Sequence, residues 1–70
     1  MESKKEILDH LIAVSSSYDK TPTPYTPMSE IPRESYEFIR NTGLRHDVKI
    51  NPKNFPNLDA IADHIIKNGV

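Results

Sequence analysis

Residues 21–32 read TPTPYTPMSEIP and contain four of the six prolines of this 70-residue chain. Proline fixes φ and biases the preceding residue toward extended backbone, so this stretch is extended before any fold forms. It separates two segments with helical patterns, and its residue pattern is the one in this sequence that the formation of a hydrophobic core explains least. The path that this stretch takes therefore decides which elements can pack together.

A helical pattern precedes the proline-rich stretch, and it predicts a helix over residues 3–17. Ser3 followed by Glu6 forms a capping box, in which each side chain can bond the other residue's main-chain N–H. An apolar stripe follows at helical spacing: Ile7, Leu8, Leu11, Ile12 and Val14. We expect residues 19–31 to form an extended segment after this helix.

A second helix is predicted over residues 32–42. Pro32 suits a first helical turn, where its missing N–H costs nothing. Gly43 predicts the end of this helix, because glycine adopts the left-handed conformation of many helix termini. In that arrangement Leu44 would pack back onto Ile39.

A third helix is predicted over residues 57–68. Asn57 is the expected N-cap, and Gly69 the expected stop. The cleanest apolar stripe of the chain lies between them: Leu58, Ile61, Ala62, Ile65 and Ile66.

Between the last two helices the pattern changes to a period of two. Residues expected on a buried face alternate with charged residues. The first set is Leu44, His46, Val48 and Ile50, and the second is Arg45, Asp47 and Lys49. This alternation predicts a β-strand over residues 44–50, which needs a partner for its main-chain groups. Pro22 and Pro24 would both face away from a neighbour, as in an edge strand, so residues 21–26 are one candidate partner. The alternative is the same strand of a second copy.

These expectations combine into an α+β fold that is mostly α. It has three helices and one short strand over residues 44–50, paired with residues 21–26 in a minimal two-stranded sheet, within a single domain of residues 1–70. The expected core comprises Ile7, Leu8, Leu11, Ile12, Tyr36, Ile39, Leu44, Val48, Ile50, Leu58, Ile61, Ile65 and Ile66.

Composition limits the function classes. Nine basic and ten acidic residues give a net charge of −1, so no strong field attracts nucleic acid or acidic lipid. Without cysteine, neither a disulfide nor a thiolate metal site can reinforce so small a core, and self-association, for example as a homodimer, is one remedy. The N-terminus lacks the features of a signal peptide. We expect a complete, soluble, cytoplasmic protein.

No catalytic, cofactor or metal motif is present in the sequence. Each of His10, His46 and His64 adjoins an aspartate, but adjacent residues on a helix point about 100° apart and do not chelate together. No serine lies in a nucleophile elbow, and no glycine lies in a phosphate-binding loop. We therefore expect a protein that is not an enzyme and that holds no cofactor or metal.

The leading functional hypothesis is a non-enzymatic interaction or regulatory protein that binds another protein, itself included. The expected surface combines the proline-rich segment, which has PxxP spacing from Pro24 to Pro27, with the second helix. Its candidate residues are Tyr25, Met28, Arg33, Tyr36 and Arg40. In the competing interpretation, Tyr25, Met28 and Ile31 fold back over the core. Stand-alone proteins of this size are common among phage and accessory bacterial genes.

The alternative hypothesis is a winged-helix-like, DNA-binding transcriptional regulator. Residues 32–42 would be its recognition helix and residues 44–55 its wing. The candidate contacts are Arg33, Arg40, Arg45, Lys49 and Lys53. Glu34 and Glu37 on the same helix argue against this hypothesis because phosphate would repel them.

Overall fold

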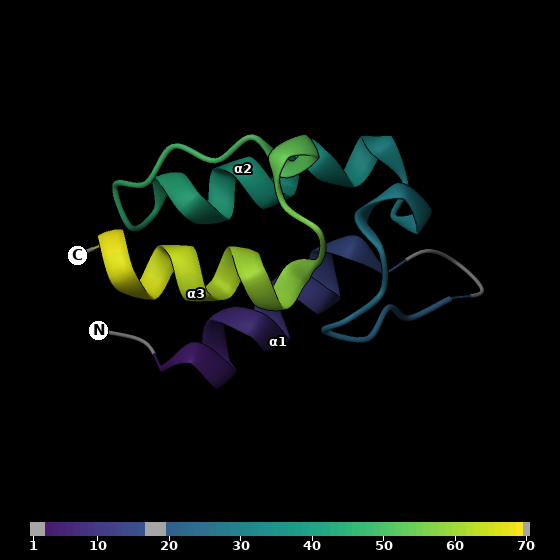
Figure 1. Cartoon of the computed structure of the whole chain (residues 1–70), viewed down its shortest axis with the longest axis horizontal. Helices are drawn as coiled ribbons and strands as arrows, with labels where there is room; N and C mark the ends of the chain where they lie inside the picture. Colours follow the sequence, from purple (N-terminus) through teal and green to yellow (C-terminus); the bar gives the residue numbers. More distant parts are fainter. Residues whose placement is uncertain (1–2, 17–19, 70) are drawn as a thin grey trace.

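The computed structural model describes residues 3–16 and 20–69. Within these residues the chain forms three α-helices, which are α1 (Lys4–Ser15), α2 (Tyr36–Leu44) and α3 (Leu58–Asn68). Three short 3₁₀ turns connect them: η1 (Met28–Glu30), η2 (Arg33–Ser35) and η3 (Pro52–Asn54). Helix α1 packs against both α2 and α3, and the proline-rich segment closes one end of the assembly (Figure 1).

The described residues contain no β-strand, so the predicted α+β class is wrong. Leu44, the expected first residue of the strand, is the last residue of α2. Asp47 then adopts a φ of 60°, which interrupts an extended run in the middle of the expected strand. Residues 48–51 follow α2 as an irregular segment instead of pairing with residues 21–26.

The proline-rich segment could not supply the expected edge strand because its amides are used locally. The Thr23 N–H donates to the Thr26 hydroxyl at 2.8 Å, and the Tyr25 N–H donates to the Thr23 hydroxyl at 3.2 Å. The Thr26 N–H donates to the Thr23 carbonyl at 3.2 Å. These bonds close a turn, and a turn of this kind satisfies the groups that a strand would have offered to a neighbour.

The N-terminal caps of two helices agree with the sequence. The Glu6 N–H donates to Ser3 Oγ at 3.3 Å, and the Glu6 carboxylate reaches back to the Ser3 N–H at 3.5 Å. The Asn57 side chain accepts from the Ala60 N–H at 2.9 Å at the start of α3. Helix α1 ends at Ser15, and residue 17, where we expected its end, lies outside the described residues.

The two glycines do not act as left-handed helix stops, because neither has a positive φ. Gly43 lies inside α2, where a Cβ would be 2.5 Å from Ile50 Cδ1 and 2.8 Å from the Val48 carbonyl oxygen. Gly69 caps α3, where a Cβ would lie 2.6 Å from the Ile65 carbonyl oxygen and 3.0 Å from His46 Cβ. Gly43 needs glycine because the segment after α2 approaches closely, whereas the nearest atom to a Cβ at Gly69 belongs to α3 itself.

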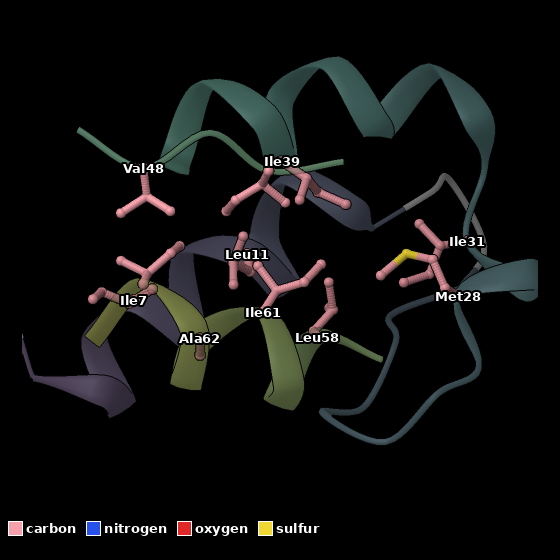
Figure 2. Packing of buried hydrophobic residues seen from close by; sticks show 11 residues of the cluster. Ile7, Leu11, Met28, Ile31, Ile39, Val48, Leu58, Ile61 and Ala62 are labelled. Atoms are coloured by element: carbon pink, nitrogen blue, oxygen red, sulfur yellow. The ribbon is translucent and has the colours of Figure 1, made fainter. Parts of the chain in front are cut away.

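The core lies between the three helices and the proline-rich segment (Figure 2). Its buried apolar residues are Ile7, Leu11, Met28, Ile31, Ile39, Val48, Ile50, Leu58, Ile61, Ala62 and Ile65. The expected core residues Leu8, Ile12, Tyr36 and Ile66 are partly buried against this cluster. Leu44 was wrongly placed in the core, since it is 53% exposed.

The proline-rich segment is anchored to the start of α3. The Met28 N–H donates to the Pro56 carbonyl at 2.9 Å, and the Asp59 N–H donates to the Pro24 carbonyl at 3.0 Å. The Met28 carbonyl in turn accepts from the Tyr36 hydroxyl at 3.0 Å. Met28 and Ile31 point inward (Figure 2), so for these two residues the interpretation that they fold back over the core is confirmed.

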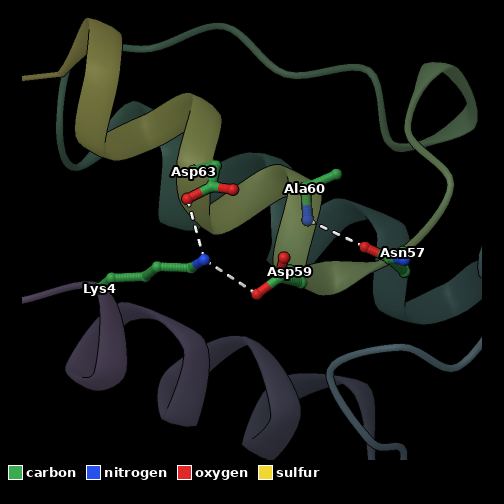
Figure 3. Close-up of polar contacts among 5 residues, drawn as sticks. All are labelled: Lys4, Asn57, Asp59, Ala60 and Asp63. Atoms are coloured by element: carbon green, nitrogen blue, oxygen red, sulfur yellow. Dashed lines mark hydrogen bonds and ion pairs between the residues drawn. The ribbon is translucent and has the colours of Figure 1, made fainter.

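One cation links α1 to α3 (Figure 3). Lys4 Nζ lies 2.9 Å from Asp63 Oδ1 and 3.0 Å from Asp59 Oδ1. Hydrogen bonds to Asp63 and then to Asp59 raise the pKa of Lys4 above its ordinary 10.5. The folded state therefore favours the protonated form of Lys4, and the stability that this adds is lost as the pH rises through the raised pKa.

Gly43→Ala should lower the free energy of unfolding by about 1–3 kcal/mol, because the added methyl group overpacks the contact with Ile50. At an open helical position the same change would raise stability by ~1 kcal/mol. Urea unfolding followed by far-UV circular dichroism measures the difference. Asn41→Ala, at an exposed position of α2, is the control and should be neutral or stabilising. A Gly43→Ala protein as stable as wild type would contradict the close approach.

Lys4→Met should lower stability at neutral pH and low salt because the bridge to α3 is lost while the aliphatic stem is kept. The difference from wild type should disappear only as the pH rises through the raised pKa of Lys4, above 10.5, where wild-type Lys4 also loses its charge. Urea midpoints measured across this pH range test the prediction. Lys5→Met serves as the control, because Lys5 is exposed and forms no ion pair with a described residue. Equal midpoints for the two variants at every pH would refute the bridge.

Candidate functional site

The segment after α2 runs back alongside that helix (Figure 1). Residues of α2 and of this segment line a groove. It consists of two adjoining hollows that share Arg40 and Ile50. The first has a volume of about 310 Å³ and is lined by Arg40, Leu44, Lys49 and Ile50. The second has a volume of about 450 Å³ and is lined by Tyr36, Arg40, Ile50, Asn51, Pro52 and Lys53. We call these eight residues together the α2 groove.

The turn after α2 creates this groove. The Gly43 carbonyl accepts from both the His46 N–H and the Val48 N–H, each at 2.9 Å, and Asp47 supplies the left-handed residue between them. The chain therefore reverses direction and returns along α2. Ile50 packs onto the bare backbone of Gly43, which brings the following residues close to the helix.

Three cations at the groove have no counter-ion in the part of the chain that the structure describes. Arg40, Lys49 and Lys53 are exposed, and their side chains form no ion pair or hydrogen bond with any described residue. No acidic residue is among the eight that line the groove. Like charges held together repel one another, so the groove favours a ligand that carries negative charge. Lys4 differs, because two aspartates already neutralise it.

The floor of the first hollow is apolar. Ile50 is buried at its base, and Leu44 is 53% exposed at its side. The aliphatic stems of Arg40 and Lys49 add further apolar surface while their charged ends stay in water. A single exposed leucine is ordinary on a protein surface, but this one borders a hollow that has cations on both sides.

The residues predicted to bind a partner do not form one surface. Tyr36 and Arg40 line the α2 groove. Arg33 is exposed on η2 but lines neither hollow, and Tyr25 is 70% exposed at the turn in the proline-rich segment. Met28, which we considered as an exposed contact, is buried at 5% exposure. Whether any of these residues binds a partner stays a prediction.

The residues of the nucleic-acid hypothesis separate into two groups. Arg40, Lys49 and Lys53 share the groove, whereas Arg45 Nη1 lies 3.4 Å from His10 Nε2 on α1. The expected wing over residues 44–55 is wrong, because that part of the chain contains the end of α2, a turn and η3 rather than strands. All three groove cations were candidates from the sequence, with Arg40 expected on the recognition helix and Lys49 and Lys53 on the wing.

Sequence analysis missed the contribution of Leu44, Ile50, Asn51 and Pro52 to a site. Period-two alternation placed Leu44 and Ile50 together on a buried face, although Leu44 is exposed. The available signal was Gly43, since a glycine within a helical pattern often marks a close approach of another segment. Nothing in the sequence specified which segment would approach.

A larger hollow of about 630 Å³ lies at the other end of the molecule. Its lining is mixed in charge and polarity: Ser15, Lys20, Thr21, Pro22, Thr26, Glu30, Ile31 and Pro32. Ser15 Oγ is buried there without a hydrogen-bond partner among the described residues. Charge of one sign does not accumulate in this hollow, since Lys20 and Glu30 both line it. It is therefore a weaker candidate than the α2 groove.

The three histidines lie in separate environments. His10 meets Arg45, His46 is buried beside Gly69, and the His64 ring lies 5.1 Å from the Phe55 ring. Across residues 3–16 and 20–69, no group of three histidine, aspartate or glutamate side chains is placed to hold a metal ion. None of the helices in this part of the chain is long and apolar enough to cross a bilayer.

No protein-family model matches this sequence, and comparisons with curated proteins and with solved structures likewise gave no match.

Proposed function

We propose that this chain is a non-enzymatic interaction protein that binds an acidic partner protein through the α2 groove. The observation that carries the proposal is the placement of Arg40, Lys49 and Lys53 along a groove that includes an apolar hollow. None of these three cations has a counter-ion among the described residues. An acidic protein segment matches both properties, because it supplies carboxylates for the cations and an apolar side chain for the floor.

The proline-rich segment has a supporting role in this proposal. Its Met28 and Ile31 are buried, and its main chain is bonded to the start of α3. The Tyr36 hydroxyl bonds to the Met28 carbonyl, so the same segment fixes one wall of the groove. We therefore assign binding to the second helix and the segment after it, rather than to the proline-rich segment.

Charge and polarity favour a protein partner over nucleic acid. A duplex-binding surface gains most of its affinity from many phosphate contacts, and this groove offers only three cations in a chain of net charge −1. Glu34 and Glu37 are exposed on η2 and α2, where they would repel phosphates. The exposed Leu44 beside an apolar hollow has no counterpart in phosphate recognition but fits an aliphatic side chain.

A display selection with random peptides tests this function. Peptides enriched on the wild-type protein should be acidic, and binding should fall at least tenfold for the Arg40→Glu/Lys53→Glu protein, because charge reversal replaces attraction with repulsion. Fluorescence anisotropy of the enriched peptides measures the change. Arg33→Glu is the matched control, since Arg33 is exposed and lies outside the groove, and it should bind like wild type.

Two results would overturn the proposal. One is enrichment of peptides that bind the charge-reversed protein as well as they bind wild type. The other is a selection that enriches no peptide, while the wild-type protein retains duplex DNA and the charge-reversed protein does not. That result would replace the proposed protein partner by nucleic acid. Sedimentation of the purified chain at several concentrations separates binding to a second copy, which the sequence also suggested, from binding to another protein.

A further inference from the structure

We infer that the α2 groove recognises a linear segment in which one aliphatic residue is flanked on both sides by carboxylates. This inference rests on the proposed function and specifies which part of an acidic partner is recognised. It follows from the different chemistry of the two hollows and from the position of Arg40 between them.

The first hollow is suited to one aliphatic side chain. Leu44 and Ile50 form its apolar surface, and its volume is about 310 Å³. A single aliphatic side chain supplies the apolar surface that this lining can bury. Arg40 and Lys49 stand at its edge, where each can meet a carboxylate next to the anchoring residue.

The second hollow is suited to a carboxylate. Arg40 and Lys53 line it together with Tyr36, Asn51 and Pro52. Arg40 lines both hollows, and its guanidinium can bind a carboxylate with two parallel hydrogen bonds. An acidic residue on one side of the aliphatic anchor would reach this hollow, while an acidic residue on its other side would face Lys49.

The main chain beside the groove favours an extended ligand. The N–H groups of Lys49, Ile50 and Asn51 form no hydrogen bond with a described residue, and neither do the carbonyls of Lys49 and Ile50. Groups of this kind can pair with the main chain of an extended peptide, as they do in other peptide-binding proteins. A helical ligand cannot offer such pairing because its own main-chain groups are already bonded.

Synthetic peptides test the inference directly. The probe is the labelled heptapeptide Glu-Asp-Glu-Leu-Glu-Asp-Glu, and its binding to the full chain is measured by fluorescence anisotropy at about 0.15 M salt. Replacement of the peptide leucine by serine should weaken binding at least tenfold, because the serine peptide loses the favourable burial of the leucine side chain. Replacement of its acidic residues by glutamine should weaken binding at least as much.

A double-mutant cycle places the anchor in the first hollow. Leu44→Ser should remove most of the difference between the leucine and serine peptides, because the apolar contact is then absent in both complexes. Phe38→Ser is the matched control, since Phe38 is 55% exposed on α2 but does not line the groove, and it should leave the difference unchanged. Circular dichroism tests whether both variants are folded. If a variant fails to fold, the comparison of the peptides on the wild-type protein still tests the aliphatic anchor.

The outcomes separate this inference from the proposed function. Equal binding of the leucine and serine peptides, with both stronger than the glutamine peptide, would overturn the aliphatic anchor and leave the acidic partner in place. Equal binding of the acidic and glutamine peptides would overturn the proposed function as well. A leucine effect that survives Leu44→Ser but is lost in Phe38→Ser would place the anchor outside the α2 groove.

Discussion

The close approach of the chain to Gly43 is the contact on which most of this structure depends. Because Gly43 has no Cβ, Ile50 and the Val48 carbonyl lie against the backbone of α2, and the Gly43 carbonyl can accept from two N–H groups of the turn that follows. This turn buries Val48 and Ile50 and carries the later residues back along the helix. Without it, Lys49 and Lys53 would not meet Arg40, and the α2 groove would not exist.

The proline-rich segment solves a second problem, the small size of the core. A chain of about 70 residues without cysteine has few ways to bury enough apolar surface. Here the segment itself supplies Met28 and Ile31, and its main chain bonds to the residues around the start of α3. Proline suits this role because its fixed φ reduces the entropy lost when an irregular segment becomes ordered.

The cations of this chain differ in whether the fold pairs them with acidic residues. Lys4 joins α1 to α3 through Asp59 and Asp63, so its charge is used within the molecule. The charges of Arg40, Lys49 and Lys53 are not satisfied by the described residues. The proposed acidic partner would supply the counter-ions that the described residues do not provide to these three cations.

The sequence by itself determined the local features whose causes lie within a few residues. The capping box at Ser3, the N-cap at Asn57 and the apolar stripe of α3 were all predictable, because capping and helical periodicity are short-range properties. Only the tertiary structure decided the path of residues 44–53 and the burial of the proline-rich segment. The alternation at residues 44–50 was compatible with a strand, but a strand needs a partner for its main-chain groups. The contact with Gly43 buries Ile50 without any strand partner. The candidate site was therefore visible in the sequence as separate cations, and long-range packing joined them into a groove.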